Sequence, residues 1–329
     1  MHPFAFVRVA DVPSAIAAVG RDSKAAFVAG GTEILNWLKE EIVTPARLVD
    51  INALPLGQIE LNDDTLQLGA LARLSDVATH PGVRGHVPAL AEALDASASV
   101  QLRNMASIGG NLMQKTRCPY FRAETALPCN KRTAGSGCSA LSGSTRSAAI
   151  FGWSEACVAT HPSDLAVALA AFDARIRIRD LHGGERAIPI DAFYRLPESD
   201  PSHETTLAHG ELIVAVDVPL SRAASHSRYL KIRERASYEF ALVSVAAGIE
   251  LESRTIREAR IALGGVAPKP WRMHAAEAAV VGVALERDAL FKALEPAFAE
   301  GRPLTENRFK VELARRAVVR TLLSAGASR

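Results

Sequence analysis

The residues Phe27-Val28-Ala29-Gly30-Gly31-Thr32-Glu33-Ile34 form the first of two glycine motifs in the chain. An apolar run at residues 25–29 leads into the two glycines, and an amphipathic stretch at residues 34–41 follows them. This order predicts a strand, a tight turn and a helix. Glycines let backbone N–H groups approach a phosphate, and Thr32 adds a hydroxyl donor. We interpret the motif as an anion-binding turn, with an ordinary tight turn as the alternative.

The second glycine motif, Ser107-Ile108-Gly109-Gly110-Asn111, again combines a hydroxyl, two glycines and an amide. We predict a second turn here, and two such turns could hold the two halves of a pyrophosphate. Neither motif fits G-x-G-x-x-G or G-x-x-x-x-G-K-[ST], so the sequence disfavours a Rossmann fold and a P-loop.

The four cysteines of the chain all lie in one short window, at Cys118, Cys129, Cys138 and Cys157. Their spacing, C-x10-C-x8-C-x18-C, lacks the C-x2-C pairs of zinc ribbons and ferredoxins. Four thiolates suit an iron–sulfur cluster or a structural zinc ion. Disulfides are the second interpretation, although a chain of this length can bury a core without them, and unligated thiols are the third.

The composition is that of a globular protein. Of 329 residues, 48% are hydrophobic and 22% charged, and the formal net charge is +2, so no excess of basic surface points to nucleic acid. No stretch approaches 18 uninterrupted apolar residues, and the N-terminus lacks a charged start followed by an apolar run. We therefore expect neither a membrane span nor an export signal. The length predicts two domains.

Helix and strand patterns alternate along the first two thirds of the chain. Helical patterns cover residues 12–19, 74–79, 89–96 and 163–172, and strand patterns cover 47–51, 66–71, 175–179 and 211–218. Residues 219–227 lose apolar periodicity and are the best linker candidate, so we place the domain boundary there. Beyond it, strand patterns at 228–233, 242–251 and 256–263 precede helical patterns at 275–281, 285–298 and 305–325.

Taken together, these segments resemble the FAD-binding subunit of molybdenum hydroxylases, the family of xanthine dehydrogenase, carbon monoxide dehydrogenase and aldehyde oxidoreductase. The resemblance covers essentially the whole chain. It rests on the two glycine motifs, on His161-Pro162-Ser163-Asp164, and on Ile261-Ala262-Leu263-Gly264-Gly265-Val266-Ala267-Pro268-Lys269-Pro270-Trp271-Arg272. It implies an α+β fold: an FAD-binding domain of two subdomains over residues 1–220, then a smaller α+β C-terminal domain over 221–329.

The cysteine window is similar to the flavin subunit of bacterial periplasmic aldehyde oxidoreductase, in which an insertion carries a [4Fe–4S] cluster. The matching segments are Cys118-Pro119-Tyr120-Phe121, Pro128-Cys129-Asn130-Lys131-Arg132, Gly135-Ser136-Gly137-Cys138 and Ser154-Glu155-Ala156-Cys157. The resemblance implies an iron–sulfur insertion at about residues 115–158 with the four cysteines as ligands. We expect the cations Arg117, Lys131 and Arg132 to offset the negative charge of the cluster.

The resemblance also assigns the flavin contacts. Residues 27–34 would wrap the FAD pyrophosphate, and Ser107, Gly110 and Asn111 would close over it. Asp164 matches the acidic residue that holds the adenosine ribose or nearby polar groups, although the residue alone suggests a helix cap shared with Ser163. Ile213 and Lys231 match two further contacts near the flavin ring system.

The function that the resemblance implies is electron transfer. The chain shows no constellation suited to oxidising an organic substrate, so we expect no catalytic side chain of its own. A large molybdopterin-binding subunit would convert an aldehyde to a carboxylic acid. A small subunit with two [2Fe–2S] centres would pass the electrons to the FAD of this chain, which delivers them to an external acceptor.

Three other functions remain as alternatives. They are a self-contained flavin oxidase or dehydrogenase, a xanthine dehydrogenase-type subunit using NAD, and a zinc-stapled assembly subunit. We expect the complex in the periplasm, carried by a partner subunit's twin-arginine signal, with the cytoplasm as the alternative.

Overall fold

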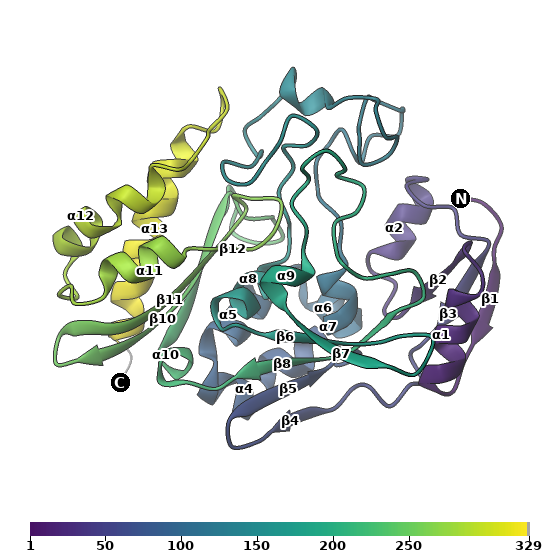
Figure 1. Cartoon of the computed structure of the whole chain (residues 1–329), viewed down its shortest axis with the longest axis horizontal. Coiled ribbons are helices and arrows are strands. Elements are labelled where there is room, and N and C mark those ends of the chain that lie inside the picture. The colour runs from purple at the N-terminus through teal and green to yellow at the C-terminus, as the bar shows by residue number, and fades with distance from the viewer. Residues whose placement is uncertain (328–329) are drawn as a thin grey trace.

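The computed structural model describes residues 1–327 and contains three sheets (Figure 1). The first is a parallel sheet in the order β1-β3-β2, formed by β1 (Ala5–Arg8), β3 (Arg47–Asp50) and β2 (Ala25–Val28). Helix α1 (Val12–Gly20) begins at Asp11, whose carboxylate caps the Ser14 N–H at 2.7 Å, and buries Val12, Ile16 and Val19. Helix α2 (Ile34–Lys39) follows the first glycine motif.

The second sheet is antiparallel and has the order β4-β5-β8-β6-β7. Its strands are β4 (Ile59–Leu61), β5 (Thr65–Gly69), β8 (Leu212–Pro219), β6 (Arg175–Arg179) and β7 (Glu185–Pro189). The helices of this region are α3 (Leu74–Thr79), α4 (Pro81–His86), α5 (Pro88–Ala96), α6 (Val100–Met105), α7 (Ile108–Leu112), α8 (Asp164–Ala171) and α9 (Ile190–Phe193). Every residue of α8 is buried, because it packs against α5 and against strands of the third sheet.

The third sheet forms the C-terminal part of the chain in the order β12-β11-β10-β9. Its antiparallel strands are β9 (Ser227–Ile232), β10 (Val243–Glu252), β11 (Thr255–Gly264) and β12 (Trp271–Arg272). The short helix α10 (Arg222–Ser225) precedes it, and α11 (His274–Val280), α12 (Arg287–Phe298) and α13 (Phe309–Gly326) follow. These helices bury Leu290, Leu294, Val318 and Leu322 against the sheet. None of the helices in residues 1–327 has the length and hydrophobicity needed to cross a bilayer.

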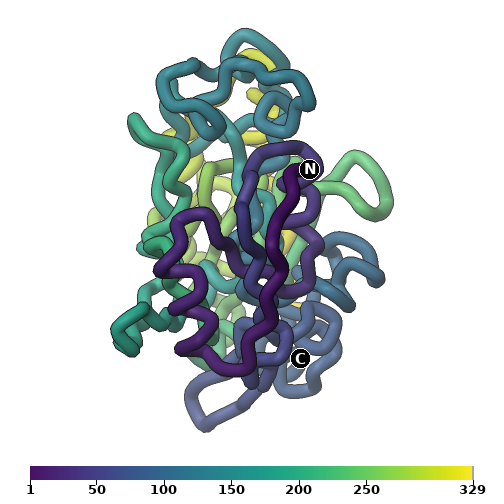
Figure 2. The backbone as a smooth tube through the Cα atoms, turned by 90° about the vertical axis from the view of Figure 1, so that its right-hand side faces the viewer, coloured from purple at the N-terminus to yellow at the C-terminus, as the bar shows by residue number. Residues whose placement is uncertain are grey.

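The cysteine-rich segment, residues 115–158, consists of loops with a single short 3-10 helix, η1 (Ser139–Leu141). Figure 1 shows it above the sheets, and the view turned by 90° shows it at the same end of the molecule (Figure 2). A small apolar cluster around Ala140, Ala148 and Val158 supports it from within. Its remaining contacts are polar and reach the first glycine motif, as described below.

The structure confirms the expected mixture of helices and sheets and corrects two local predictions. The second glycine motif is not a plain turn, because Ile108–Leu112 form the short helix α7, which Ser107 caps by accepting a hydrogen bond from the Gly110 N–H at 3.3 Å. The linker candidate contains the helix α10. Strand β1 was not predicted, because all its residues are exposed and its sequence shows no apolar alternation.

Candidate functional site

The first glycine motif is in direct contact with Met105 and Ala106, which lead straight into the second motif. A Cβ added to Gly30 would lie 1.8 Å from the Met105 carbonyl oxygen, so only glycine allows this approach. Two polar side chains join the same segments: Arg73 Nη1 donates to the Met105 oxygen at 2.5 Å and its Nη2 to Asn52 Oδ1 at 2.8 Å. Asn52 Nδ2 in turn donates to the Ala29 oxygen at 3.0 Å. The motifs are therefore held together by packing and by a chain of hydrogen bonds.

Both motifs face one large cavity of about 470 Å³. This volume lies within the roughly 300–1,000 Å³ of ordinary small-molecule sites, and the lining offers backbone N–H groups, hydroxyls and cations. The residues predicted as flavin contacts that line it are Phe27, Val28, Ala29, Gly30, Gly31, Thr32, Glu33, Ile34, Ser107, Gly110, Asn111, Asp164 and Lys231. The lining therefore suits a ligand that carries phosphate groups.

Ile213 lies apart from the other predicted contacts. It is buried in β8, pairs with Ile178 of β6 and belongs to the main hydrophobic core. It is not among the residues that line the large cavity. Its contact with a flavin stays a prediction, and the core packing of the side chain accounts for its position.

Asp164 and Lys231 form a buried ion pair on the cavity wall. Lys231 Nζ lies 2.8 Å from Asp164 Oδ2, with side-chain exposures of 3% and 6% respectively. The Tyr229 hydroxyl donates to Asp164 Oδ1 at 2.6 Å. Burial raises the pKa of the Asp164 carboxyl, while Lys231 and Tyr229 act in the opposite direction. The cap of α8 is Ser163, which accepts from the Ala166 N–H at 3.0 Å, so Asp164 is free for the ion pair.

Glu33 is the most highly connected residue of the first motif. Its Oε1 accepts hydrogen bonds at 2.6 Å from both Arg117 and Arg122, at 2.7 Å from Trp37 Nε1 and at 3.2 Å from the Lys115 N–H. Burial works to raise the pKa of Glu33, but the two guanidinium groups lower it overall, so the carboxylate stays ionised. Three of these donors come from the cysteine-rich segment, which sequence reasoning did not connect to this motif.

The four cysteines line one small cavity, called the cysteine cavity below, of about 10 Å³. Cys129 and Cys138 face each other as an isolated antiparallel bridge, and all four thiols are free, so the disulfide interpretation is not realised here. Burial raises the pKa of Cys157 to about 11 and also raises that of Cys118. Within residues 1–327, no group of three or more His, Cys, Asp or Glu side chains is gathered closely enough to hold a metal ion. The predicted cluster stays a prediction.

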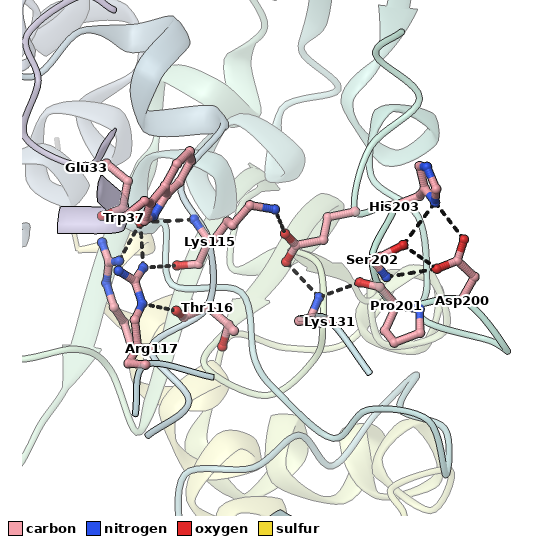
Figure 3. A network of polar contacts seen from close by, with 12 residues as sticks. Glu33, Trp37, Lys115, Thr116, Arg117, Lys131, Asp200, Pro201, Ser202 and His203 are labelled. Atoms are coloured by element: carbon pink, nitrogen blue, oxygen red, sulfur yellow. Dashed lines mark hydrogen bonds and ion pairs between the residues drawn. The ribbon is translucent and has the colours of Figure 1, made fainter. Parts of the chain in front are cut away.

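The cations expected around the cluster are engaged by protein groups. Lys131 Nζ lies 2.7 Å from Glu204 Oε1 and 3.0 Å from the Pro201 oxygen, and Lys115 pairs with the other oxygen of Glu204 at 2.8 Å (Figure 3). Arg132 Nη1 donates to the Ala123 oxygen at 2.8 Å. Arg117 turns toward Glu33. These side chains are therefore already bonded to protein groups, Lys131 and Arg117 in ion pairs and Arg132 to backbone carbonyl oxygens.

An adjoining cavity of about 80 Å³ shares lining residues with the two others. Arg117, Asp164 and Phe240 line both it and the large cavity, and Cys118 lines both it and the cysteine cavity. His161 also lines it, with Nε2 buried and without a hydrogen-bond partner among the described residues. Burial lowers the pKa of His161 to about 4, so the ring is neutral at physiological pH.

Comparison with known proteins places the chain in a family. Residues 2–221 match the FAD binding domain in molybdopterin dehydrogenase, and residues 228–325 match the CO dehydrogenase flavoprotein C-terminal domain. The chain is 47% identical to the aldehyde oxidoreductase FAD-binding subunit PaoB of Escherichia coli (strain K12), over 99% of both chains. It is 26% identical to the glyceraldehyde dehydrogenase medium chain of Sulfolobus acidocaldarius, over 94% of this chain and 92% of that one.

A solved structure of carbon monoxide dehydrogenase from Hydrogenophaga pseudoflava superposes with a TM-score of 0.76 at 26% identity, covering 99% of this chain and 98% of that one. The chain therefore belongs to the FAD-binding subunits of the molybdenum hydroxylases and is an oxidoreductase subunit. The predicted family and fold class are confirmed. FAD is therefore the cofactor of this chain, and the individual contact residues in the large cavity remain predictions.

Proposed function

We propose that this chain is the electron-transfer subunit of a molybdenum-dependent aldehyde oxidoreductase. The observation that carries the proposal is the 47% identity, over 99% of both chains, to a subunit named for aldehyde oxidoreduction. The structure adds a cavity that fits the cofactor, because both glycine motifs present backbone and hydroxyl donors to it. When bound, FAD supplies reversible uptake and release of one or two electrons.

The chain's own residues would bind and enclose the flavin. The first motif offers N–H groups where Gly30 and Gly31 carry no side chains, and Ser107 and Asn111 also line the cavity. The Lys231–Asp164 pair is neutral overall and nearly inaccessible to water, so it contributes a fixed polar wall. The proposal assigns the substrate reaction to a partner subunit.

We further propose that Cys118, Cys129, Cys138 and Cys157 bind one [4Fe–4S] cluster. The support is that all four cysteines line the same cavity. A structural zinc ion held by the four thiolates is the alternative, and metal analysis distinguishes the two. Ligation must release protons, since burial raises the pKa of Cys157 to about 11.

The complex that we propose contains a large molybdopterin-binding subunit and a small subunit with two [2Fe–2S] centres, and it reduces an external electron acceptor. Two relatives are named as medium chains, which supports an assembly of this kind. The periplasm, reached on a partner's twin-arginine signal, is the proposed location. Cell fractionation of the producing organism would test it against the cytoplasm.

Anaerobic co-purification with the two partner subunits tests the function. We expect an aldehyde to reduce the flavin in the assembled complex and to leave the flavin of the isolated chain oxidised. Reduction by aldehyde in the isolated chain would instead establish a self-contained flavin enzyme. Reduction of the complex by NADH would favour the xanthine dehydrogenase type.

Metal analysis tests the cluster separately. We expect about four irons and four sulfides per flavin in the wild-type chain. Iron and sulfide should be lost in Cys129→Ser and retained in Ser142→Ala, a control in the same segment with an exposed side chain. One zinc per chain, or iron retained in Cys129→Ser, would contradict the cluster while leaving the FAD site intact.

A further inference from the structure

The cations beside the first glycine motif come from the cysteine-rich segment. Residues 27–34 include no lysine or arginine, so the motif alone can neutralise a diphosphate only through backbone and hydroxyl donors. Arg117 and Arg122 line the large cavity and both bind Glu33 of the motif. Figure 3 shows Arg117 beside Glu33 and Trp37. The segment that carries the cysteines therefore also forms part of the wall for FAD.

Arg122 is fully engaged by the protein. Its Nε donates to the Thr116 oxygen at 3.0 Å, its Nη1 to Glu40 at 2.9 Å and its Nη2 to Glu33 at 2.6 Å. The side chain is 13% exposed. Because all three nitrogens of this guanidinium already donate to protein oxygens, few N–H donors remain for a ligand.

Arg117 differs from Arg122 in having donors to spare. Its Nη1 donates to Glu33 at 2.6 Å and its Nη2 to Gln114 at a longer 3.3 Å, while Nε has no acceptor within residues 1–327. The side chain is 28% exposed, and the guanidinium lies 5.0 Å from the centre of the Phe240 ring. Glu33 on one side and Phe240 on the other fix its direction along the cavity wall. A planar guanidinium held this way suits a phosphate ligand.

We propose that Arg117 binds the diphosphate of FAD and that Glu33 is the positioning residue that holds Arg117 in place. The inference rests on the proposed function, since it requires FAD in the large cavity. Glu33 directly follows the turn, and an unpaired carboxylate there would repel a diphosphate. Because its Oε1 accepts from two guanidinium groups, the negative charge is offset, and one of the two cations remains available to the ligand.

Flavin titrations of the full-length chain test the assignment. The chain, stripped of flavin, is titrated with FAD and with riboflavin, which shares the ring system and has no phosphate. We expect Arg117→Met to weaken FAD binding roughly tenfold to hundredfold, the range for hydrogen bonds to charged groups, and to leave riboflavin binding unchanged. Arg117→Lys keeps the charge and loses the planar, two-pronged donor geometry, so its affinity for FAD should lie between those of the wild type and Arg117→Met.

Arg146 supplies a matched control. It lies in the same segment, pairs with Glu234 at 2.6 Å and packs 4.9 Å from the Phe309 ring, but it does not line the large cavity. We expect Arg146→Met to bind both ligands like the wild type. Thermal unfolding of each variant without flavin shows whether it is folded, and the riboflavin titration provides a second check on the cavity.

The role of Glu33 is tested by Glu33→Gln, alone and combined with Arg117→Met. If Glu33 positions Arg117, the single change weakens FAD binding, and it has no further effect when Arg117 is already replaced. If Glu33 only repels the diphosphate, the single change strengthens FAD binding, which would overturn the positioning role.

Two results would overturn the assignment of Arg117. Equal weakening of FAD and riboflavin would mean general damage to the cavity, and unchanged FAD binding in Arg117→Met would exclude a diphosphate contact. In both cases the wild type binds FAD, so the proposed function stands. A folded wild-type chain that does not bind FAD would overturn the proposed function and this inference with it.

Discussion

The close approach of Gly30 to Met105, just before the second glycine motif, predicts a large effect for Gly30→Ala. The new Cβ would lie 1.8 Å from the Met105 oxygen and 2.6 Å from its carbon, so the backbones must separate by roughly 1.2 Å or more to reach a tolerable distance. The carbonyl cannot move freely, because Arg73 binds it at 2.5 Å. Overpacking costs about 1–3 kcal/mol, and the weakened hydrogen bond from Arg73 adds to that cost. We therefore expect the free energy of unfolding to fall by about 3 kcal/mol.

Two other glycines provide matched controls for this substitution. Gly31 has a φ of 74° and only the Leu35 side chain near its Cβ position, so Gly31→Ala should cost about 1–2 kcal/mol through backbone strain. Gly57 has open space around it, and Gly57→Ala should change stability by less than about 0.5 kcal/mol. Urea unfolding without flavin measures these costs apart from ligand stabilisation.

The same substitution should also weaken FAD binding, because the two motifs that face the cavity are displaced relative to one another. A flavin titration of the three variants gives the order Gly30→Ala, Gly31→Ala, Gly57→Ala from weakest to strongest. If Gly30→Ala were as stable as Gly57→Ala and bound FAD like the wild type, the motifs would not be locked together, and the account of the site given above would be wrong.

Three further changes test buried polar groups. Burial lowers the pKa of Lys310 from 10.5 to about 7, so between pH 7 and 10.5 this side chain is protonated in the unfolded chain and neutral in the folded chain. The free energy of unfolding should therefore rise with pH in this range, by up to about 1.4 kcal/mol per pH unit. Lys310→Met should abolish this slope in urea unfolding. The pKa of His161 is lowered from 6.5 to about 4, so wild-type stability should fall as the pH drops through this window, and His161→Phe should remove that fall in the same assay. The buried Tyr194 hydroxyl donates to the Leu112 oxygen at 2.9 Å, so thermal unfolding of Tyr194→Phe should show a loss of about 1–3 kcal/mol.

Elements with a strong local signal could be predicted from the sequence. Residues 74–79 and 175–179 were predicted as a helix and a strand, and the structure has α3 and β6 at the same bounds. Apolar residues at helical or alternating spacing give these elements one buried face, which is a property of the segment itself. Strand β1 has no such face, and it exists because it pairs in parallel with β3.

The candidate site was predictable where its residues are contiguous. Both glycine motifs and the cysteine window stand out in the sequence because chemically similar residues are close together. Asn52 and Arg73, which join the two motifs, were missed because each is a single polar residue whose partner lies 20 or more positions away. The helix α7 was missed because paired glycines suggest a turn, whereas the capping hydrogen bond from Gly110 to Ser107 stabilises a helical turn.

The cysteine-rich segment is a structural part of the wall of the large cavity, the proposed flavin site. Three of the four hydrogen bonds to Glu33 Oε1 come from Lys115, Arg117 and Arg122, and only that of Trp37 comes from outside the segment. Without the segment, a largely buried carboxylate would be left beside the diphosphate site with a single donor, which is costly for folding and for binding an anion. Arg117 lines the large cavity and directly precedes Cys118. A rearrangement of the backbone at Cys118 is therefore expected to move Arg117. The loading of the proposed cluster and the affinity for FAD are therefore expected to depend on each other.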